Sequence, residues 1–156
     1  MIKVLFVCHG NICRSPMAEF IMKDLVKKAG LETQVAIESA ATSTGEIGCP
    51  VYPPARRKLA EHGIDCAGKT ARQLVRADYG WDDLLIGMDR ANLINMNRIC
   101  DGDHDGKIHL LMEFTGRPGD VVDPWYTDDF DATWRDVLEG CQGLLKDLTN
   151  TKASRL

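Results

Sequence analysis

The stretch FVCHGNICRSPMAEF, which runs from Phe6 to Phe20, places several chemically useful side chains close together. Cys8 offers a thiol that becomes a nucleophile when it loses its proton. Arg14 carries a planar guanidinium that can bind two oxygens of a phosphate. Gly10 lets the backbone curl inward between them without a side chain in the way. The stretch predicts an anion-binding loop with a nucleophile at its base. A CxxxxxR pattern alone is weak, however, and the alternative is that Cys8 is a core thiol at a strand end.

The flanking sequence predicts the elements that would present this loop. The apolar run Ile2–Val7 is typical of a buried strand. From Ser15 the apolar residues follow helical spacing, with Ser15 as the expected N-cap, Pro16 at the first helical position and Gly30 as the stop. A loop between a strand and a helix N-terminus presents unpaired N–H groups and the positive end of the helix dipole. An anion is favoured there, and so is a thiolate at Cys8, which indicates attack on a phosphoryl group.

A second stretch, VVDPWYTDDF from Val121 to Phe130, supplies a candidate acid. A phosphocysteine mechanism requires a group that protonates the leaving oxygen. Asp123 precedes Pro124, which favours an extended backbone at Asp123. Trp125 and Tyr126 follow and offer flat surfaces for an aromatic ring. The alternative is that Asp-Pro only turns the chain and that the nearby acids form a solvated face.

Composition and charge narrow the classes of function. The chain has 156 residues, 44% of them hydrophobic and 27% charged, with a net charge of -4 and no long block of Lys or Arg. These values do not favour a nucleic-acid groove or a membrane surface. The short apolar run near the N-terminus is not a signal peptide, and no run is long enough to span a bilayer, so we expect a cytoplasmic protein without membrane insertion. Six cysteines without a CxxC pair favour buried thiols over a zinc site or disulfides. Dinucleotide-binding and Walker glycine patterns are absent.

The rest of the chain alternates short apolar runs with helical patterns. Strands alternating with helices predict a parallel sheet wrapped by helices, and hence a single α/β domain over 1–156. The loop after the first strand then lies at the carboxyl ends of the strands, where such sheets bind ligands. The further strands are expected at Gln34–Glu38, Leu84–Met88 and Lys107–Met112, and the further helices at Pro54–His62, Arg90–Ile99 and Ala132–Leu148.

These motifs resemble those of the low-molecular-weight protein tyrosine phosphatases. VCHGNICRSPMAE is similar to the phosphate-binding loop and following helix of that family, and DPWY is similar to its acid loop. ESAATSTGEIG, from Glu38 to Gly48, resembles its variable wall loop. HGID and ARQL lie between these motifs in the same order, so the resemblance covers essentially the whole chain.

The resemblance implies a three-layer α/β fold, with a four-stranded parallel sheet and helices on both faces. It implies that Cys8 is the nucleophile, that Arg14 binds the phosphate and the transition state, and that Asp123 is the general acid and later the general base. It implies loop support from Ser39 and from His62, which matches a position that is structural in the family. No metal or cofactor is implied, and the partners are phosphotyrosine proteins or small aryl phosphates. The residues implied to line the phosphate and aryl site are His9, Gly10, Asn11, Ile12, Cys13, Ser15, Trp125 and Tyr126.

Four positions bear on specificity and regulation. Related arginine phosphatases carry Thr where this chain has Ile12, so Ile12 favours phosphotyrosine. Gly45 stands where the wall loop of the family usually carries an aromatic residue. The missing ring leaves one side of the slot for the substrate's aromatic ring open. His9 either lines the rim, where a protonated ring would favour anionic substrates, or contributes only its backbone N–H. Cys13 is expected near Cys8, where it either traps an oxidised Cys8 as a disulfide or is only a packed neighbour.

Other functions on the same scaffold remain open at this level. An arsenate reductase requires a further pair of cysteines that can relay a disulfide, and the four remaining cysteines are widely spaced. A protein arginine phosphatase would use the same loop. A non-catalytic phosphotyrosine-binding module is expected to lack the nucleophile or the acid. The oligomeric state is not fixed by the sequence, and a monomer is expected.

Overall fold

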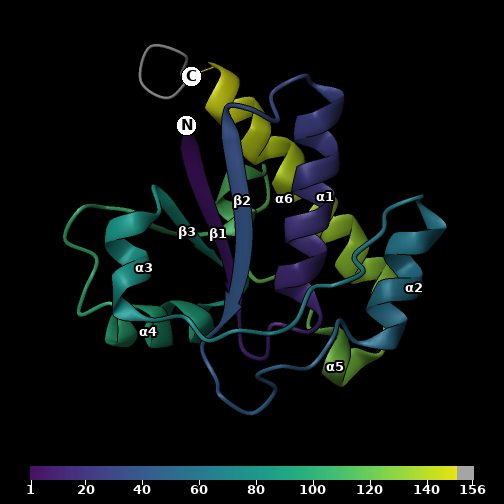
Figure 1. Ribbon diagram of the computed structural model, residues 1–156, viewed down its shortest axis with the longest axis horizontal. Helices are drawn as coiled ribbons and strands as arrows, with labels where there is room; N and C mark the ends of the chain where they lie inside the picture. Colours follow the sequence, from purple (N-terminus) through teal and green to yellow (C-terminus); the bar gives the residue numbers. More distant parts are fainter. Residues whose placement is uncertain (151–156) are drawn as a thin grey trace.

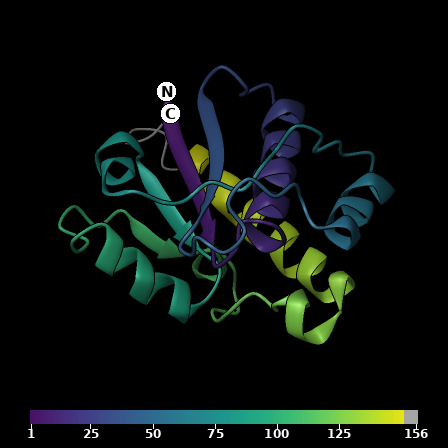
Figure 2. The ribbon, with the colours of Figure 1, turned by 60° about the horizontal axis from the view of Figure 1, so that its bottom comes forward.

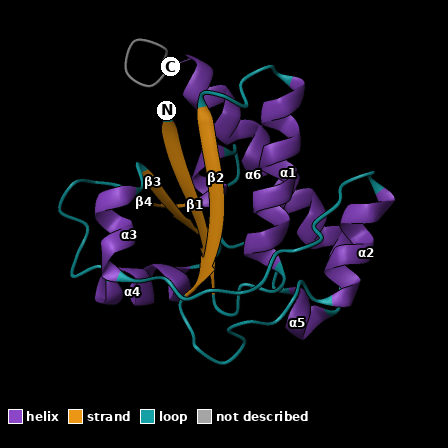
Figure 3. Cartoon of the chain, in the orientation of Figure 1, coloured by secondary structure: helices purple, strands orange, loops and turns teal. Residues whose placement is uncertain are grey.

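The computed structural model, described here for residues 1–150, has one parallel sheet between two layers of helices (Figures 1 and 3). The strand order is β2-β1-β3-β4, and every neighbouring pair is parallel. The strands are β1 (Ile2–Cys8), β2 (Val35–Ala41), β3 (Leu84–Gly87) and β4 (Ile108–Leu110).

Helices cover both faces of the sheet. One side holds α1 (Arg14–Lys28), α2 (Pro53–Glu61) and α6 (Phe130–Asn150), which pack on one another (Figure 1). The other side holds α3 (Arg76–Trp81) and α4 (Arg90–Ile99). Two short helices complete the described chain: a 3-10 turn, η1 (Leu111–Phe114), and α5 (Pro124–Thr127). No helix within residues 1–150 is long and apolar enough to cross a membrane.

The central strand β1 is apolar from Val4 to Cys8 because both of its faces are buried there. Successive side chains of a strand point to opposite faces. Val4 and Phe6 accordingly join the core under α1 and α6, whereas Leu5 and Val7 join the core under α3 and α4. The sequence therefore predicted this strand from a continuous apolar run instead of an alternating one.

Most of the expected elements are present, with three corrections. The expected strand Lys107–Met112 is too long, because residues from Leu111 onward turn into η1. Ser15 is not the N-cap of the first helix: α1 begins at Arg14 after Cys13, so Pro16 lies at the third helical position. The helices α3 and α5 were not predicted, because six and four residues are too few to show a helical period.

The parallel arrangement gathers the functional loops at one edge of the sheet. Cys8 ends β1 beside Ala41, which ends β2, and β3 ends next to them at Gly87. The segment before α5 is fixed to the same edge, because the Val121 N–H donates to the Met88 carbonyl at 2.8 Å. Figure 2 brings this edge forward and shows the loops after the strands gathered there, with the green chain that leads on to the last helices passing close to them.

Asp82, directly after α3, is a buried carboxylic acid that works against the stability of the fold. Its side chain is 3% exposed, and its Oδ2 atom has no hydrogen-bond partner among the described residues. Burial, followed by the charges of Asp78 and Glu38, raises the pKa of Asp82 to about 6. The folded protein therefore binds this proton more tightly than the unfolded chain does. Protonated Asp82 therefore stabilises the folded state at acid pH. This contribution to the free energy of unfolding is lost as the pH rises through about 6.

We expect Asp82→Asn to raise the free energy of unfolding by roughly 1–3 kcal/mol at about pH 7.5 and to change it little at about pH 4. Urea unfolding at the two pH values measures the difference. Asp65→Asn, at an exposed acid, is the control and should give no such gain. An equal effect of Asp82→Asn at both pH values would contradict the assignment.

Candidate active site

Asn11 holds the loop between β1 and α1 in an unusual shape. Its backbone φ is 58°, in the left-handed region that non-glycine residues seldom adopt, and its side chain is buried. Its Nδ2 atom donates to Ser15 Oγ at 2.7 Å and to Ser39 Oγ at 3.0 Å. Its Oδ1 atom accepts from the Arg72 backbone N–H at 3.2 Å. These bonds hold the strained backbone in place and curl the loop around the space above Cys8.

The Cys8 thiol lies at the base of this loop between two polar groups. Its Sγ atom is 3.0 Å from Ser15 Oγ, and the Asn11 backbone N–H donates to it at 3.3 Å. Because Ser15 Oγ already accepts a hydrogen bond from Asn11, its own proton is free to point at the sulfur. Both groups can therefore donate hydrogen bonds to the sulfur, which lies at the loop that leads into α1.

A buried carboxylate, Glu19 on α1, supports the loop from behind. Ser39 donates its hydroxyl proton to Glu19, so the hydrogen bonds run from Asn11 through Ser39 to Glu19. Two lysines offset the buried charge: Lys23 at 2.6 Å and Lys69 at 3.5 Å. Burial lowers the pKa of Lys69, although the carboxylate opposes this shift. The network extends the polar contacts of the loop into the core without leaving an unpaired charge.

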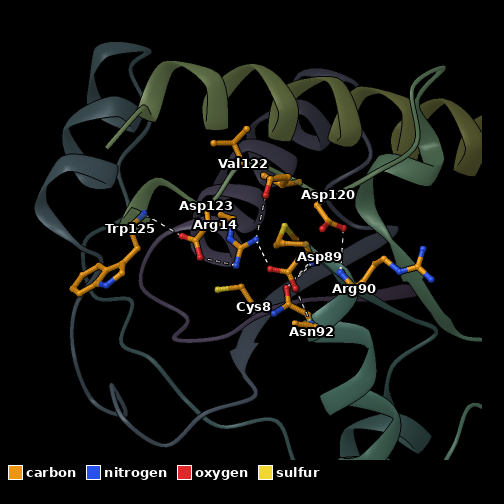
Figure 4. Close-up of polar contacts among 12 residues, drawn as sticks. Cys8, Arg14, Asp89, Arg90, Asn92, Asp120, Val122, Asp123 and Trp125 are labelled. Atoms are coloured by element: carbon orange, nitrogen blue, oxygen red, sulfur yellow. Dashed lines mark hydrogen bonds and ion pairs between the residues drawn. The ribbon is translucent and has the colours of Figure 1, made fainter. Parts of the chain in front are cut away.

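Arg14 is buried between two acids above Cys8 (Figure 4). Its guanidinium contacts Asp89 at 2.8 Å and Asp123 at 3.3 Å, and it donates to the Val121 carbonyl at 3.3 Å. Burial alone would lower the pKa of Arg14, but Cys8, Asp123 and Asp89 together raise it above its usual value. The side chain is therefore a fixed cation whose fork is oriented before any ligand arrives.

Asp123 reaches the site from the segment that connects η1 to α5. It is the N-cap of α5, and its Oδ1 atom accepts from the Trp125 backbone N–H at 3.0 Å. The residues before Asp123 are held on two sides, because the Val122 carbonyl accepts from Thr133 Oγ1 at 2.9 Å and the Asp120 side chain accepts from the Arg90 backbone N–H at 3.1 Å. Figure 4 shows Asp123 facing Arg14 and Cys8.

These groups surround a cavity of about 390 Å³. Its base is formed by the loop that carries Cys8 and Arg14, and α4 forms one wall. The wall loop approaches from the other side and is tied to the phosphate loop, because the Ser43 N–H donates to the His9 carbonyl at 3.0 Å. The residues that line the cavity are Cys8, His9, Gly10, Ile12, Cys13, Arg14, Ser43, Gly45, Glu46, Asp89, Ala91, Asn92, Asn95, Asp123, Trp125 and Tyr126.

The structure brings nearly all of the expected residues together. Asn11, Ser15 and Ser39 lie beneath the cavity and form the network that supports it. His9 is exposed and lies on the rim, and Gly45 leaves the wall open beside it. His62 lies elsewhere: its ring stacks on Trp134 of α6 at 3.7 Å between centroids, and within residues 1–150 no hydrogen bond or ring contact joins it to the loop.

The sequence reading missed Asp89, although two signals pointed to it. Asp89 directly follows a predicted strand, so it lies at the ligand-binding edge of the sheet. It also precedes a predicted helix, and Asp is a favoured N-cap. The structure shows both: Asp89 Oδ1 accepts from the Asn92 N–H at 2.7 Å, and Oδ2 contacts Arg14.

Within residues 1–150, no three His, Cys, Asp or Glu side chains gather in a group suited to a metal ion.

Comparisons with known proteins agree with this geometry. The family described as low molecular weight phosphotyrosine protein phosphatase matches residues 3–154. The low molecular weight protein-tyrosine-phosphatase YfkJ of Bacillus subtilis is 36% identical over 97% of this chain and 99% of its own sequence. The YfkJ crystal structure superposes with a TM-score of 0.94, covering 97% of each chain.

Two further solved structures are similar over most of the chain. The low molecular weight protein tyrosine phosphatase SP-PTP of Streptococcus pyogenes is 39% identical, with a TM-score of 0.87 and complete coverage of both chains. The Drosophila arginine phosphatase DARP is 30% identical, with a TM-score of 0.86 over 94% of this chain and 97% of its own.

The fold and site define a cysteine-based phosphatase scaffold. The chain belongs to the low molecular weight protein tyrosine phosphatase family, whose members are hydrolases.

We expect Asp89→Asn to lower kcat/KM for an aryl phosphate about tenfold, because Arg14 loses the carboxylate that orients it. Asn is itself a good N-cap, so α4 and the melting temperature should change little. Asp89→Ala removes the cap as well and should cost about 1 kcal/mol of stability in addition. If Asp89→Asn retained full kcat/KM, Asp89 would be a helix cap and no more.

Proposed function

We propose that this enzyme hydrolyses phosphotyrosine and small aryl phosphates through a phosphocysteine intermediate on Cys8. The observation that carries the proposal is the joint placement of three groups at one cavity. The Cys8 thiol lies at the base, the Arg14 guanidinium above it, and the Asp123 carboxyl group at the rim, in contact with Arg14 at 3.3 Å. Nucleophile, cation and acid are the parts that phosphoryl transfer to a cysteine requires.

In the first step, the Cys8 thiolate attacks phosphorus. The S–P bond forms while the bond between phosphorus and the aryl oxygen breaks, and protonated Asp123 donates its proton to the departing oxygen. Arg14 and the N-terminus of α1 stabilise the charge on the phosphoryl oxygens. The guanidinium is held by Asp89 before substrate arrives, so little reorganisation is needed.

In the second step, water attacks the phosphocysteine. Asp123, now a carboxylate, removes a proton from this water, the S–P bond breaks, and inorganic phosphate leaves. The electrons of the broken bond return to sulfur as a thiolate. Ser15, whose hydroxyl lies 3.0 Å from Cys8, stabilises that thiolate by donating its proton in a hydrogen bond. The cycle restores Cys8 and Asp123 to their starting states.

The cavity favours an aromatic phosphoester. Ile12 and the exposed rings of Trp125 and Tyr126 give it apolar surfaces beside a deep nucleophile. A protein arginine phosphatase is the alternative within this scaffold, since the similar Drosophila structure carries that name. Arsenate reduction is less well supported, because Cys66, Cys100 and Cys141 are buried.

We further propose that residues 1–156 act as one phosphatase domain, as a monomer in the cytoplasm. Free thiols are kept reduced in the cytosol, where disulfides are rare. All six cysteines lie within residues 1–150 and are free, which is consistent with such a compartment.

The direct test is hydrolysis of 4-nitrophenyl phosphate in the presence of EDTA and a reducing agent. We expect turnover in the wild-type enzyme and a loss of at least roughly 10⁴-fold in Cys8→Ser, because a hydroxyl at this position cannot replace the thiolate. Cys66→Ser, which changes a buried thiol outside the cavity, should keep wild-type turnover.

The same assay separates the substrate classes. Phosphotyrosine peptides should be hydrolysed with a higher kcat/KM than phosphoarginine peptides of equal length. The reverse order would favour an arginine phosphatase. No turnover of either by the folded enzyme would reject the phosphatase proposal.

A redox role is supported by the position of Cys13, which lines the same cavity as Cys8. Burial, followed by the charges of Cys8 and Asp123, raises the pKa of Cys13 to about 12, so Cys13 has to lose its proton as it attacks the oxidised Cys8. Hydrogen peroxide would convert the Cys8 thiolate to a sulfenic acid. The Cys13 thiol would then attack its sulfur and release water, leaving a disulfide.

We expect Cys13→Ser to recover several-fold less activity than the wild type when peroxide treatment is followed by a thiol reductant. The missing disulfide leaves Cys8 open to irreversible oxidation. Cys49→Ser is the matched control at another cysteine. Equal recovery by wild type and Cys13→Ser would remove the protective role.

A further inference from the structure

Tyr52 contacts both halves of the active site, although it does not line the cavity. It is the N-cap of α2, and its backbone N–H donates to the Ile12 carbonyl in the phosphate loop at 2.9 Å. Its ring lies 5.2 Å from the Trp125 ring on α5, at an interplanar angle of 57°. The same ring lies 6.3 Å from Phe130, the first residue of α6. The Tyr52 ring therefore connects α6 to α5, which we call the acid helix because Asp123 caps it. The Tyr52 backbone N–H connects the start of α2 to the phosphate loop.

The acid helix depends on such contacts because it is very short. A helix of four residues has no stability of its own in water. Pro124 is buried, but Trp125 is 56% exposed and Tyr126 is 84% exposed. The chain leaves α5 through Asp128, whose left-handed backbone has a φ of 58°. The Tyr52 ring packs on α5 and on the start of α6, on the two sides of this turn.

The position of Trp125 bears directly on the acid. The Trp125 backbone N–H donates to Asp123 Oδ1, whereas Asp123 Oδ2 contacts Arg14. A displacement of Trp125 would withdraw the donor that orients Asp123 and leave its carboxyl group held by Arg14 alone. Asp123 could then lean toward Arg14 instead of toward the leaving oxygen of the substrate.

We propose that Tyr52 is a positioning residue for the acid step: its ring holds α5, through Trp125, where Asp123 can reach the leaving oxygen. The inference rests on the proposed role of Asp123 as the general acid. The contact is one of ring packing, so a phenylalanine at position 52 should serve equally well.

The test compares two substrates whose leaving groups differ in their need for a proton. Phenyl phosphate releases a basic phenoxide that requires the acid, whereas 2,4-dinitrophenyl phosphate releases a weakly basic anion that does not. Tyr52→Ala keeps the backbone N–H that holds Ile12 and removes only the ring. We expect it to lower kcat/KM for phenyl phosphate about 3- to 10-fold and for 2,4-dinitrophenyl phosphate about twofold or less.

Three further variants separate positioning from general stability. Tyr52→Phe should match the wild type with both substrates. Trp134→Leu removes the ring stack on His62 between α2 and α6, so it should lower the melting temperature without changing the ratio of the two kcat/KM values. Tyr52→Ala added to Asp123→Asn should cause no further loss with phenyl phosphate, because the acid is already gone.

The outcomes are distinct. An equal loss with both substrates, or a loss that multiplies with Asp123→Asn, would show that Tyr52 only stabilises the fold and would overturn the inference. Full kcat/KM with both substrates in Tyr52→Ala would overturn it as well. If Asp123→Asn itself showed no dependence on the leaving group, the acid assignment would fall, and the inference with it. If Tyr52→Ala does not fold, Tyr52→Leu, which keeps apolar bulk, is expected to show the same selective loss in smaller degree.

Discussion

The left-handed backbone at Asn11 is the constraint on which the rest of the site depends. A phosphate loop must curl tightly enough to surround an anion, and a residue with a side chain resists that curvature. Asn11 adopts it because its buried amide is held by Ser15, Ser39 and the Arg72 backbone. The same amide leaves the Ser15 proton free for Cys8, so one side chain sets both the shape of the loop and the hydrogen bond at the Cys8 sulfur. Glu19 and its lysines then fix Ser39 from behind.

The other half of the site is organised by charge. Arg14 is a buried cation between Asp89 and Asp123, which come from segments following β3 and preceding α5. Neither acid is near Arg14 in sequence, and the parallel sheet brings all three to one edge. Asp89 can keep its place when substrate binds, because it also caps α4. Asp123 instead caps α5, so its placement depends on a helix of only four residues.

The sequence predicted the parts of this arrangement that local patterns record. The run Ile2–Val7 and the helical stripe after Ser15 predicted the first strand, the loop and the first helix, and the Asp-Pro pair drew attention to Asp123, which lies at the cavity. The cap of α1 was misplaced because Ser15, a typical N-cap residue, has its hydroxyl committed to Cys8. The partners of Arg14 and the ring contacts of Tyr52 could not be predicted, since they join segments that only the folded chain brings together. Family resemblance supplied roles for single residues, and it did not supply this coupling.

In the proposed mechanism, Cys8 carries the phosphoryl group between substrate and water. The most direct measurement is a rapid acid quench of the enzyme during turnover of 4-nitrophenyl phosphate, with mass spectrometry of the peptide that contains Cys8. We expect one phosphoryl group on Cys8, together with a burst of 4-nitrophenolate equal to the enzyme concentration. A linear release of product with no phosphorylated peptide, or a phosphoryl group on another residue, would contradict it.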